Sequence, residues 1–132
     1  SAYQEWKNII GKHGHLLTES SVGGRPISVF KLSKPIIISD SFNVNVLELP
    51  SPKDGSFYRE GFEHIEVVTT QSLQSLLTKF PDYNFKTKKI NDEMNADISL
   101  QFDEGCVKFH EQTLEAVVDK EKIMALNDLT RR

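Results

Sequence analysis

The sequence predicts an α+β protein in which short strands and helices form two consecutive modules. Residues 62–112 follow the order strand, helix, strand, strand, strand, which is a complete βαβββ unit. Residues 1–55 follow the order helix, strand, strand, strand, which matches that unit with its first strand missing. A final helix is expected at about residues 114–126. We therefore expect a single domain over residues 1–132, made of an incomplete first module and a complete second one.

The first module opens with a pattern that is typical of an amphipathic helix. Apolar side chains recur at three- and four-residue spacing over residues 3–17. A loop follows, with a tight turn at Gly23 and Gly24. Alternating apolar and polar residues then predict strands, and Pro35 separates the first of them from the second. The expected strands are residues 27–32, 36–38 and 44–49.

The second module carries clearer signals. Leucines at helical spacing predict a helix over residues 71–80, which Pro81 ends because proline cannot continue a helix. Lysines in residues 84–90 predict an edge strand, since charged side chains protect a sheet edge from unwanted pairing. The expected strands are residues 64–68, 84–90, 98–102 and 106–110.

Composition excludes several classes of protein. The 132 residues include 16 Lys and Arg against 19 Asp and Glu, and the net charge of −3 gives no basic surface for a nucleic-acid partner. The single cysteine, Cys106, excludes an internal disulfide and a multi-cysteine zinc site. Apolar runs such as residues 36–38 are too short to span a membrane, and we expect a cytoplasmic protein.

Polar side chains on three predicted strands are candidates for a metal site. His64 and Glu66 share one face of their strand, because side chains alternate along a strand. His110 shares a face with Lys108, and Glu48 lies near the end of another strand. One carboxylate and two imidazoles suit a divalent ion such as Zn, Fe, Mn, Ni or Co. Spacing alone does not bring these strands together, so solvated polar faces remain the alternative.

The connector between the modules is rich in aromatic residues. Its Tyr58 and Arg59 offer a stacking surface and a cation, which suit an anionic organic ligand. Lys108, on the same strand face as His110, is a further candidate for ligand binding. A loop that only covers the core would explain Tyr58 and Arg59 equally well.

Four segments together resemble the YecM family in the same order along nearly the whole chain. They are residues 24–27 (GRPI), 46–50 (VLELP), 60–68 (EGFEHIEVV) and 107–110 (VKFH). Members of this family are similar in fold to the vicinal oxygen chelate superfamily, which includes glyoxalase I and the extradiol dioxygenases. The resemblance therefore implies paired βαβββ modules of the glyoxalase type that curl around a cleft.

The resemblance also implies a site and a function. Metal ligands in that superfamily come from the first and last strands of each module, which correspond here to Glu48, His64 and His110. Glu66 would then serve as a catalytic base or as a partner of a ligand, while Tyr58 or Arg59 orients a small oxygenated molecule. The implied activity is that of a metal-dependent isomerase, lyase or oxygenase. A non-catalytic domain that binds a small molecule in the same cleft is the alternative.

YecM-like chains also resemble longer proteins whose first strand carries a histidine. We therefore expect a truncated domain with one metal ligand absent, which would be inactive in this form. Such a domain would expose an unpaired sheet edge, and that edge favours a homodimer.

Overall fold

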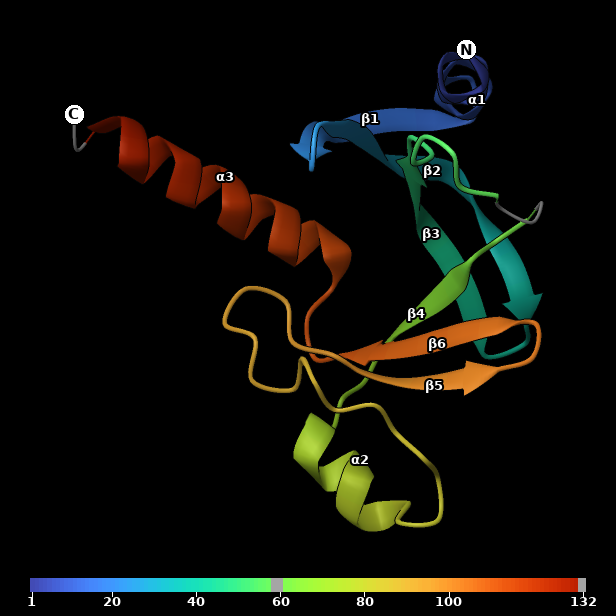
Figure 1. The fold of residues 1–132 in the computed structure, drawn as a ribbon, viewed down its shortest axis with the longest axis vertical. Coiled ribbons are helices and arrows are strands. Elements are labelled where there is room, and N and C mark those ends of the chain that lie inside the picture. Colours follow the sequence, from blue (N-terminus) through green and yellow to red (C-terminus); the bar gives the residue numbers. More distant parts are fainter. Residues whose placement is uncertain (58–60, 131–132) are drawn as a thin grey trace. The chain divides into compact units, whose positions relative to one another are not determined.

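The computed structural model describes residues 1–57 and 61–130, and it divides the chain into two compact units. Unit 1 is Ser1–Tyr58 and unit 2 is Arg59–Arg132. Each unit contains one three-stranded sheet (Figure 1). None of the helices in the described residues is both long and apolar enough to cross a membrane.

Unit 1 is one helix followed by an antiparallel sheet with the strand order β1-β2-β3 (Figure 1). Its elements are α1 (Ala2–Gly11), β1 (Gly14–Val22), β2 (Arg25–Ser39) and β3 (Phe42–Pro50). Gly23 and Gly24 form the two-residue turn between β1 and β2, with φ angles of 58° and 78°. Positive φ at both positions is what a type I′ hairpin turn requires, and glycine adopts it without steric cost.

The helix expected over residues 3–17 is wrong in its second half. α1 ends at Gly11, and residues 14–22 pair with β2 as strand β1 instead. Gly14 lies so close to β2 that a Cβ atom there would be 2.3 Å from the carbonyl oxygen of Lys31. Pairing with β2 therefore overrides the helical spacing of the apolar residues, because tertiary contacts routinely outweigh local propensity.

The two short strands expected at 27–32 and 36–38 are also wrong, because they are parts of the single strand β2. Pro35 does not end this strand. It lies between Lys31 and Ile36, where the register between β2 and β3 shifts. It also lies beyond Leu32, the last residue of β2 that pairs with β1. A proline is tolerated at such an irregularity because no ladder hydrogen bond needs its missing N–H.

Polar contacts attach α1 to the sheet of unit 1. Of the described residues of α1, none is buried. The Glu19 carboxylate on β1 instead accepts hydrogen bonds from Lys7 Nζ at 2.5 Å, from Tyr3 Oη at 2.7 Å and from the buried Ser28 Oγ at 2.9 Å. These bonds, that from Lys7 first, lower the pKa of Glu19 to about 2. Glu19 is therefore the common acceptor that links α1, β1 and β2.

Unit 2 has the strand order β4-β6-β5, in which β4 runs parallel to β6 and β5 runs antiparallel to it (Figure 1). Its elements are β4 (His64–Val68), α2 (Leu73–Lys79), β5 (Ile98–Phe102), β6 (Gly105–His110) and α3 (Leu114–Thr130). Ser72 caps α2 by accepting a hydrogen bond from the Ser75 amide at 3.1 Å. The buried apolar side chains of this unit are Leu73, Ile98, Val117 and Val118.

The edge strand expected at residues 84–90 is reduced to a single bridge between Lys86 and Ser99. The backbone then turns away from the sheet, with the Ile90 amide bonded to the Thr87 carbonyl. Phe85 is the residue of this segment that packs on the sheet, edge to face with Phe109 at 6.0 Å between ring centroids. Exposed lysine side chains leave little apolar area to hold a longer strand in place.

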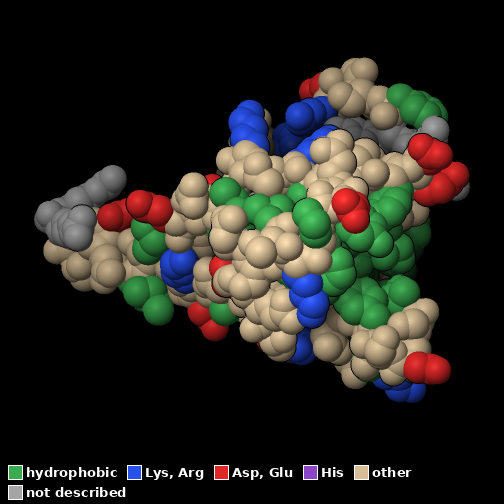
Figure 2. Space-filling model, turned by 90° about the horizontal axis from the view of Figure 1, so that it is seen from below, with side chains coloured by type: hydrophobic (Ala, Val, Ile, Leu, Met, Phe, Trp, Pro, Cys, Tyr) green, Lys and Arg blue, Asp and Glu red, His purple; other side chains and the backbone are tan. Residues whose placement is uncertain are grey.

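The helix α3 is anchored near its first turns and exposed further on. Val117 and Val118 are buried, whereas Ile123, Met124, Leu126 and Leu129 are exposed. Figure 2 shows apolar and acidic side chains side by side along this helix, which ends at the grey residues 131–132.

Gly14→Ala should lower the free energy of unfolding by about 1–3 kcal/mol, because the new methyl group meets backbone that cannot move aside easily. Gly11→Ala is the matched control, since its Cβ would lie 4.0 Å from the nearest atom, Phe30 Cε1. That control should be neutral or stabilising by up to about 1 kcal/mol. Urea denaturation of both variants measures the difference, and equal losses would contradict the close approach at Gly14.

Glu19→Gln should remove a component of stability that depends on pH. Because the pKa of Glu19 is lowered to about 2 in the folded protein, its stabilising effect is present above the unfolded value of about 4.3 and is lost as the pH falls toward 2. The wild-type protein should therefore lose more stability than the variant between about pH 5 and pH 2. Thermal unfolding across this range measures it, and parallel pH profiles would refute the role of Glu19.

Candidate functional site

Two histidines and one glutamate lie on the same face of the unit 2 sheet. In the parallel ladder of β4 and β6, His64 pairs with Cys106, Glu66 with Lys108, and Val68 with His110. Paired residues share a face and side chains alternate along each strand, so His64, Glu66 and His110 all project to one side. Parallel pairing of two strands that lie far apart in the sequence thus brings together residues that the spacing alone could not.

The Glu66 carboxylate lies between the two imidazole rings. Its Oε1 atom is 3.2 Å from His64 Nε2 and 3.6 Å from His110 Nε2. The His64 and Glu66 side chains are partly exposed, at 25% and 31%, whereas that of His110 is 4% exposed. The cluster therefore has one buried end, at His110, and one end that solvent or a ligand can reach.

The two ring nitrogens of His110 have different surroundings. Nδ1 lies 3.0 Å from the carbonyl oxygen of Ala96, and since a carbonyl only accepts, Nδ1 carries the hydrogen and donates it. Nε2 is buried and has no hydrogen-bond partner among the described residues. In the neutral ring, this arrangement leaves the lone pair on Nε2, which lies 3.6 Å from Glu66 Oε1.

The pKa values of Glu66 and His110 shift in opposite directions. Burial alone would raise the pKa of Glu66, but the interaction with His110 and then that with His64 outweigh it and hold this pKa well below its usual range. Burial alone would lower the pKa of His110, yet the Glu66 carboxylate outweighs it, so the pKa of His110 is raised.

His64, Glu66 and His110 are of the residue types that bind divalent metal ions, although their donor atoms do not surround a common point. Among residues 1–57 and 61–130, no three His, Cys, Asp or Glu side chains are already grouped as metal ligands. Two imidazoles and a carboxylate are nevertheless the ligands that zinc and iron(II) sites use. The buried Nε2 of His110 forms no hydrogen bond in the described structure and is held only by a 3.6 Å contact with Glu66 Oε1, and this is the observation that favours an ion there.

The other residues singled out in the sequence lie elsewhere or remain untested as site residues. Glu48 is an exposed residue of β3 in unit 1, where it pairs with Val29. Since the two units are described separately, Glu48 as a partner of His64 and His110 stays a prediction. Lys108 lies level with Glu66 on the same face. Tyr58 and Arg59 fall outside the described residues.

The support of His110 contains groups that sequence reasoning missed. The Ala96 carbonyl is a backbone group and leaves no trace in the residue type. The loop that carries it is folded by Asp92, whose Oδ1 accepts hydrogen bonds from the amides of Met94 and Asn95, each at 2.9 Å. Lys120 on α3 donates to the carbonyls of Glu93 at 3.0 Å and of Met94 at 3.3 Å. An Asp that begins a short polar loop is a turn signal that could have pointed to this segment.

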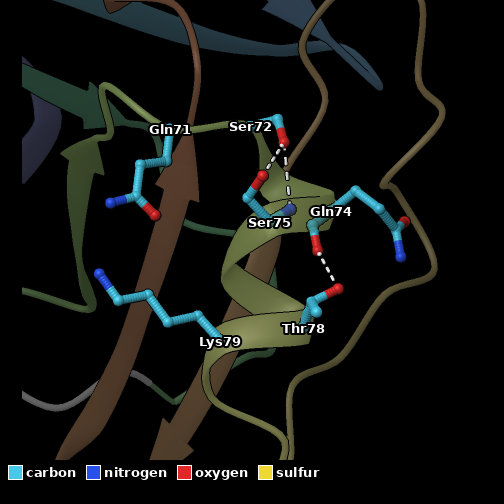
Figure 3. A pocket seen from close by; sticks show the side chains of 6 residues that line it. All are labelled: Gln71, Ser72, Gln74, Ser75, Thr78 and Lys79. Atoms are coloured by element: carbon cyan, nitrogen blue, oxygen red, sulfur yellow. Dashed lines mark hydrogen bonds between the residues drawn. The ribbon is translucent and has the colours of Figure 1, made fainter.

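A separate hollow of about 460 Å³ lies beside α2 (Figure 3). It is lined by Gln71, Ser72, Gln74, Ser75, Thr78 and Lys79. In Figure 3 the Gln71 and Lys79 side chains extend to one side of the helix, while Ser72 Oγ and Ser75 Oγ bond to each other at 2.7 Å. None of the candidate site residues lines this hollow, so the histidine cluster rather than the hollow is the chemical centre of unit 2.

The fold and the cluster define an α+β protein with two small sheets, one of which gathers two histidines around a glutamate. The family model of the YecM protein matches residues 1–121. The chain therefore belongs to the YecM family, and the resemblance noted in the sequence is confirmed.

Two relatives and one solved structure agree with this assignment. The chain is 27% identical to Protein YecM of Escherichia coli over an alignment of 134 positions. This alignment covers 90% of this chain and 71% of that protein. It is 38% identical to an uncharacterized protein of Haemophilus influenzae over 65 residues, which cover 49% of this chain and 34% of that protein. A structural-genomics structure of a protein called EC4020 has a TM-score of 0.69 and 28% identity, covering 90% of this chain and 69% of that one.

Glu66→Gln should lower the pKa of His110, because burial then acts on the ring without the opposing carboxylate. In the wild-type protein the pKa of His110 is raised, so its protonated ring stabilises the fold. This stabilisation is fully present below the unfolded pKa of about 6.5 and is lost as the pH rises through the folded pKa. The lowered pKa of Glu66 stabilises the fold above about 4.3. Relative to the wild type, the variant should therefore lose most stability between about pH 4.3 and pH 6.5. NMR titration of the histidine rings measures the pKa, and an unchanged His110 would contradict the coupling.

Proposed function

We propose that this chain binds a divalent metal ion through His64, Glu66 and His110. The observation that carries the proposal is the buried Nε2 of His110, which has no hydrogen-bond partner in the described structure while Nδ1 is held by a carbonyl. Burying an unsatisfied polar atom costs about 1–3 kcal/mol, so its retention calls for a partner. A metal ion coordinated by that atom supplies one.

A purely structural ion pair between His110 and Glu66 explains the cluster less well. The separation of 3.6 Å between His110 Nε2 and Glu66 Oε1 exceeds the length of a charge-assisted hydrogen bond, which is about 2.7–2.9 Å. His64 already lies nearer to the same oxygen, at 3.2 Å. Two imidazoles that face one carboxylate oxygen are better matched to a cation held by all three than to one ion pair.

The three proposed ligands contribute in different ways to the metal site. His110 provides a fixed, buried nitrogen donor, and His64 and Glu66 provide donors on the side that a ligand can reach. When bound, the ion supplies Lewis-acid chemistry that polarises a carbonyl or a similar oxygen of a small molecule. Lys108, level with Glu66 on the same face, supplies a positive charge that favours an anionic ligand.

We place this site within a module of the vicinal oxygen chelate type, acting as an isomerase, lyase or oxygenase on a small oxygenated ligand. Three features of unit 2 support the placement. Its first and last strands, β4 and β6, are parallel neighbours, α2 lies between them in sequence, and β5 pairs with β6. The candidate ligands lie on those first and last strands.

The direct test is metal binding by tag-free protein. Zn²⁺, Mn²⁺, Fe²⁺, Co²⁺ and Ni²⁺ are titrated into the apo protein, and the most tightly bound ion is then compared across His64→Ala, Glu66→Ala and His110→Ala. Each variant should bind at least about 100-fold more weakly, since even losing the outer partner of a ligand costs about 10–100-fold. His15→Ala is the matched control, because His15 is an exposed histidine of unit 1. Thermal unfolding is recorded alongside to exclude loss of fold.

Equal affinity in wild type, His64→Ala and Glu66→Ala would overturn the proposal. Turnover of 1,2-dicarbonyl and catechol panels then separates an enzyme from a binding protein, since a chain that holds metal without turnover fits the second.

A further inference from the structure

One loop accepts hydrogen bonds both from α3 and from the buried histidine of the candidate site. Lys120 Nζ donates to the carbonyls of Glu93 and Met94 at 3.0 Å and 3.3 Å. The same loop ends at Ala96, whose carbonyl accepts the Nδ1 hydrogen of His110 at 3.0 Å. A residue of the C-terminal helix is therefore linked to the site without contacting it.

The loop between these two contacts is folded by a side chain of its own. Asp92 Oδ1 accepts hydrogen bonds from the amides of Met94 and Asn95, which turn the backbone directly before Ala96. These two bonds, that of Asn95 first, also lower the pKa of the Asp92 carboxyl, and the positive charges of Lys89 and then Lys120 lower it further. Two backbone hydrogen bonds to the Lys89 carbonyl, from the amides of Asp92 and Asp97, hold the two ends of the loop, while the Met94 and Asn95 side chains between them are only half-buried.

Both ends of this link are anchored in the core of unit 2. Val117 and Val118 are 2% and 5% exposed, and they fix the start of α3 one turn before Lys120. Ile98, which follows the loop, is fully buried, and the backbone of His110 is bonded to the Thr69 amide at 2.8 Å. Between these anchors, the side-chain hydrogen bonds of Lys120 and Asp92 fix residues 93–95 of the loop.

We propose that Lys120 and Asp92 are positioning residues, which hold residues 92–96 so that the Ala96 carbonyl fixes His110 as the Nδ1–H tautomer. Nε2 is then the donor for the metal ion, with its ring held in one orientation. This inference rests on the proposed metal site for its consequence, but the position and tautomer of His110 are properties of the protein before any ion binds.

The test therefore begins with the metal-free protein. Long-range ¹H–¹⁵N NMR spectra of the histidine rings, recorded at alkaline pH where the rings are neutral, report the tautomer of His110. The wild-type protein should show the Nδ1–H form. Lys120→Met, which keeps the apolar stem, and Asp92→Ala should each populate the Nε2–H form.

Conservative variants distinguish positioning from general stability. Lys120→Arg can still donate to the loop carbonyls, and Asp92→Asn can still accept the two amide hydrogens, so both should restore the wild-type tautomer. Lys88→Met is the control for loss of one positive charge, since Lys88 is an exposed residue of the preceding turn. It should leave the His110 ring unchanged.

Metal affinity gives the second readout. Lys120→Met and Asp92→Ala should weaken binding by about tenfold, the lower end of the cost of losing the outer partner of a ligating histidine, and the conservative variants should restore it. An unchanged His110 tautomer in both disruptive variants would overturn the inference, whether or not metal binds. If the wild-type protein binds no metal, the proposed function fails, while the tautomer measurement still decides the role of Lys120 and Asp92.

Discussion

The parallel pairing of β4 with β6 is the constraint on which unit 2 depends. Parallel neighbours cannot be joined by a hairpin, so the chain must cross over between them, and α2, the loop to Ala96 and β5 all lie in that crossover. The same pairing sets His110 two residues along the ladder from the partner of Glu66, Lys108. A shift of one residue in this register would turn His110 away from the cluster, because alternate side chains face opposite sides of a sheet.

Much of the fold could be predicted from the sequence where one strand face is apolar and the other polar. Residues 64–68 and 98–102 alternate cleanly, and both form strands with the expected bounds. Residues 14–22 could not be recognised, because the features that make them a strand lie in β2: a backbone so close that only Gly14 fits. The strand expected at residues 84–90 is absent for a reason that the sequence does not show either. The pairing of this segment with the sheet is limited to the bridge between Lys86 and Ser99.

The candidate site could also be predicted from the sequence only in part. Period-two alternation places His64 and Glu66 on one face from the sequence alone, but it carries no information on which other strand lies beside them. The contact of Glu66 with both rings follows from pairing between strands about 40 residues apart, and the support of His110 comes from a backbone carbonyl. Such support has no signature in residue type, so the sequence indicated the ligands but not what orients them.

The attachment of α1 has a consequence for motion in unit 1. An isolated helix of ten residues is marginal in water, and α1 adds no buried side chain of its own, so its docking depends on the polar contacts at Glu19. Opening α1 breaks these contacts but leaves the β1-β2-β3 pairing intact, whereas separating β2 from its neighbours breaks that pairing and exposes Val29 and Phe30. Unit 1 should thus have a sub-global state in which the helix has come away and the sheet persists, and amide hydrogens of α1 would exchange through it well before those of β2.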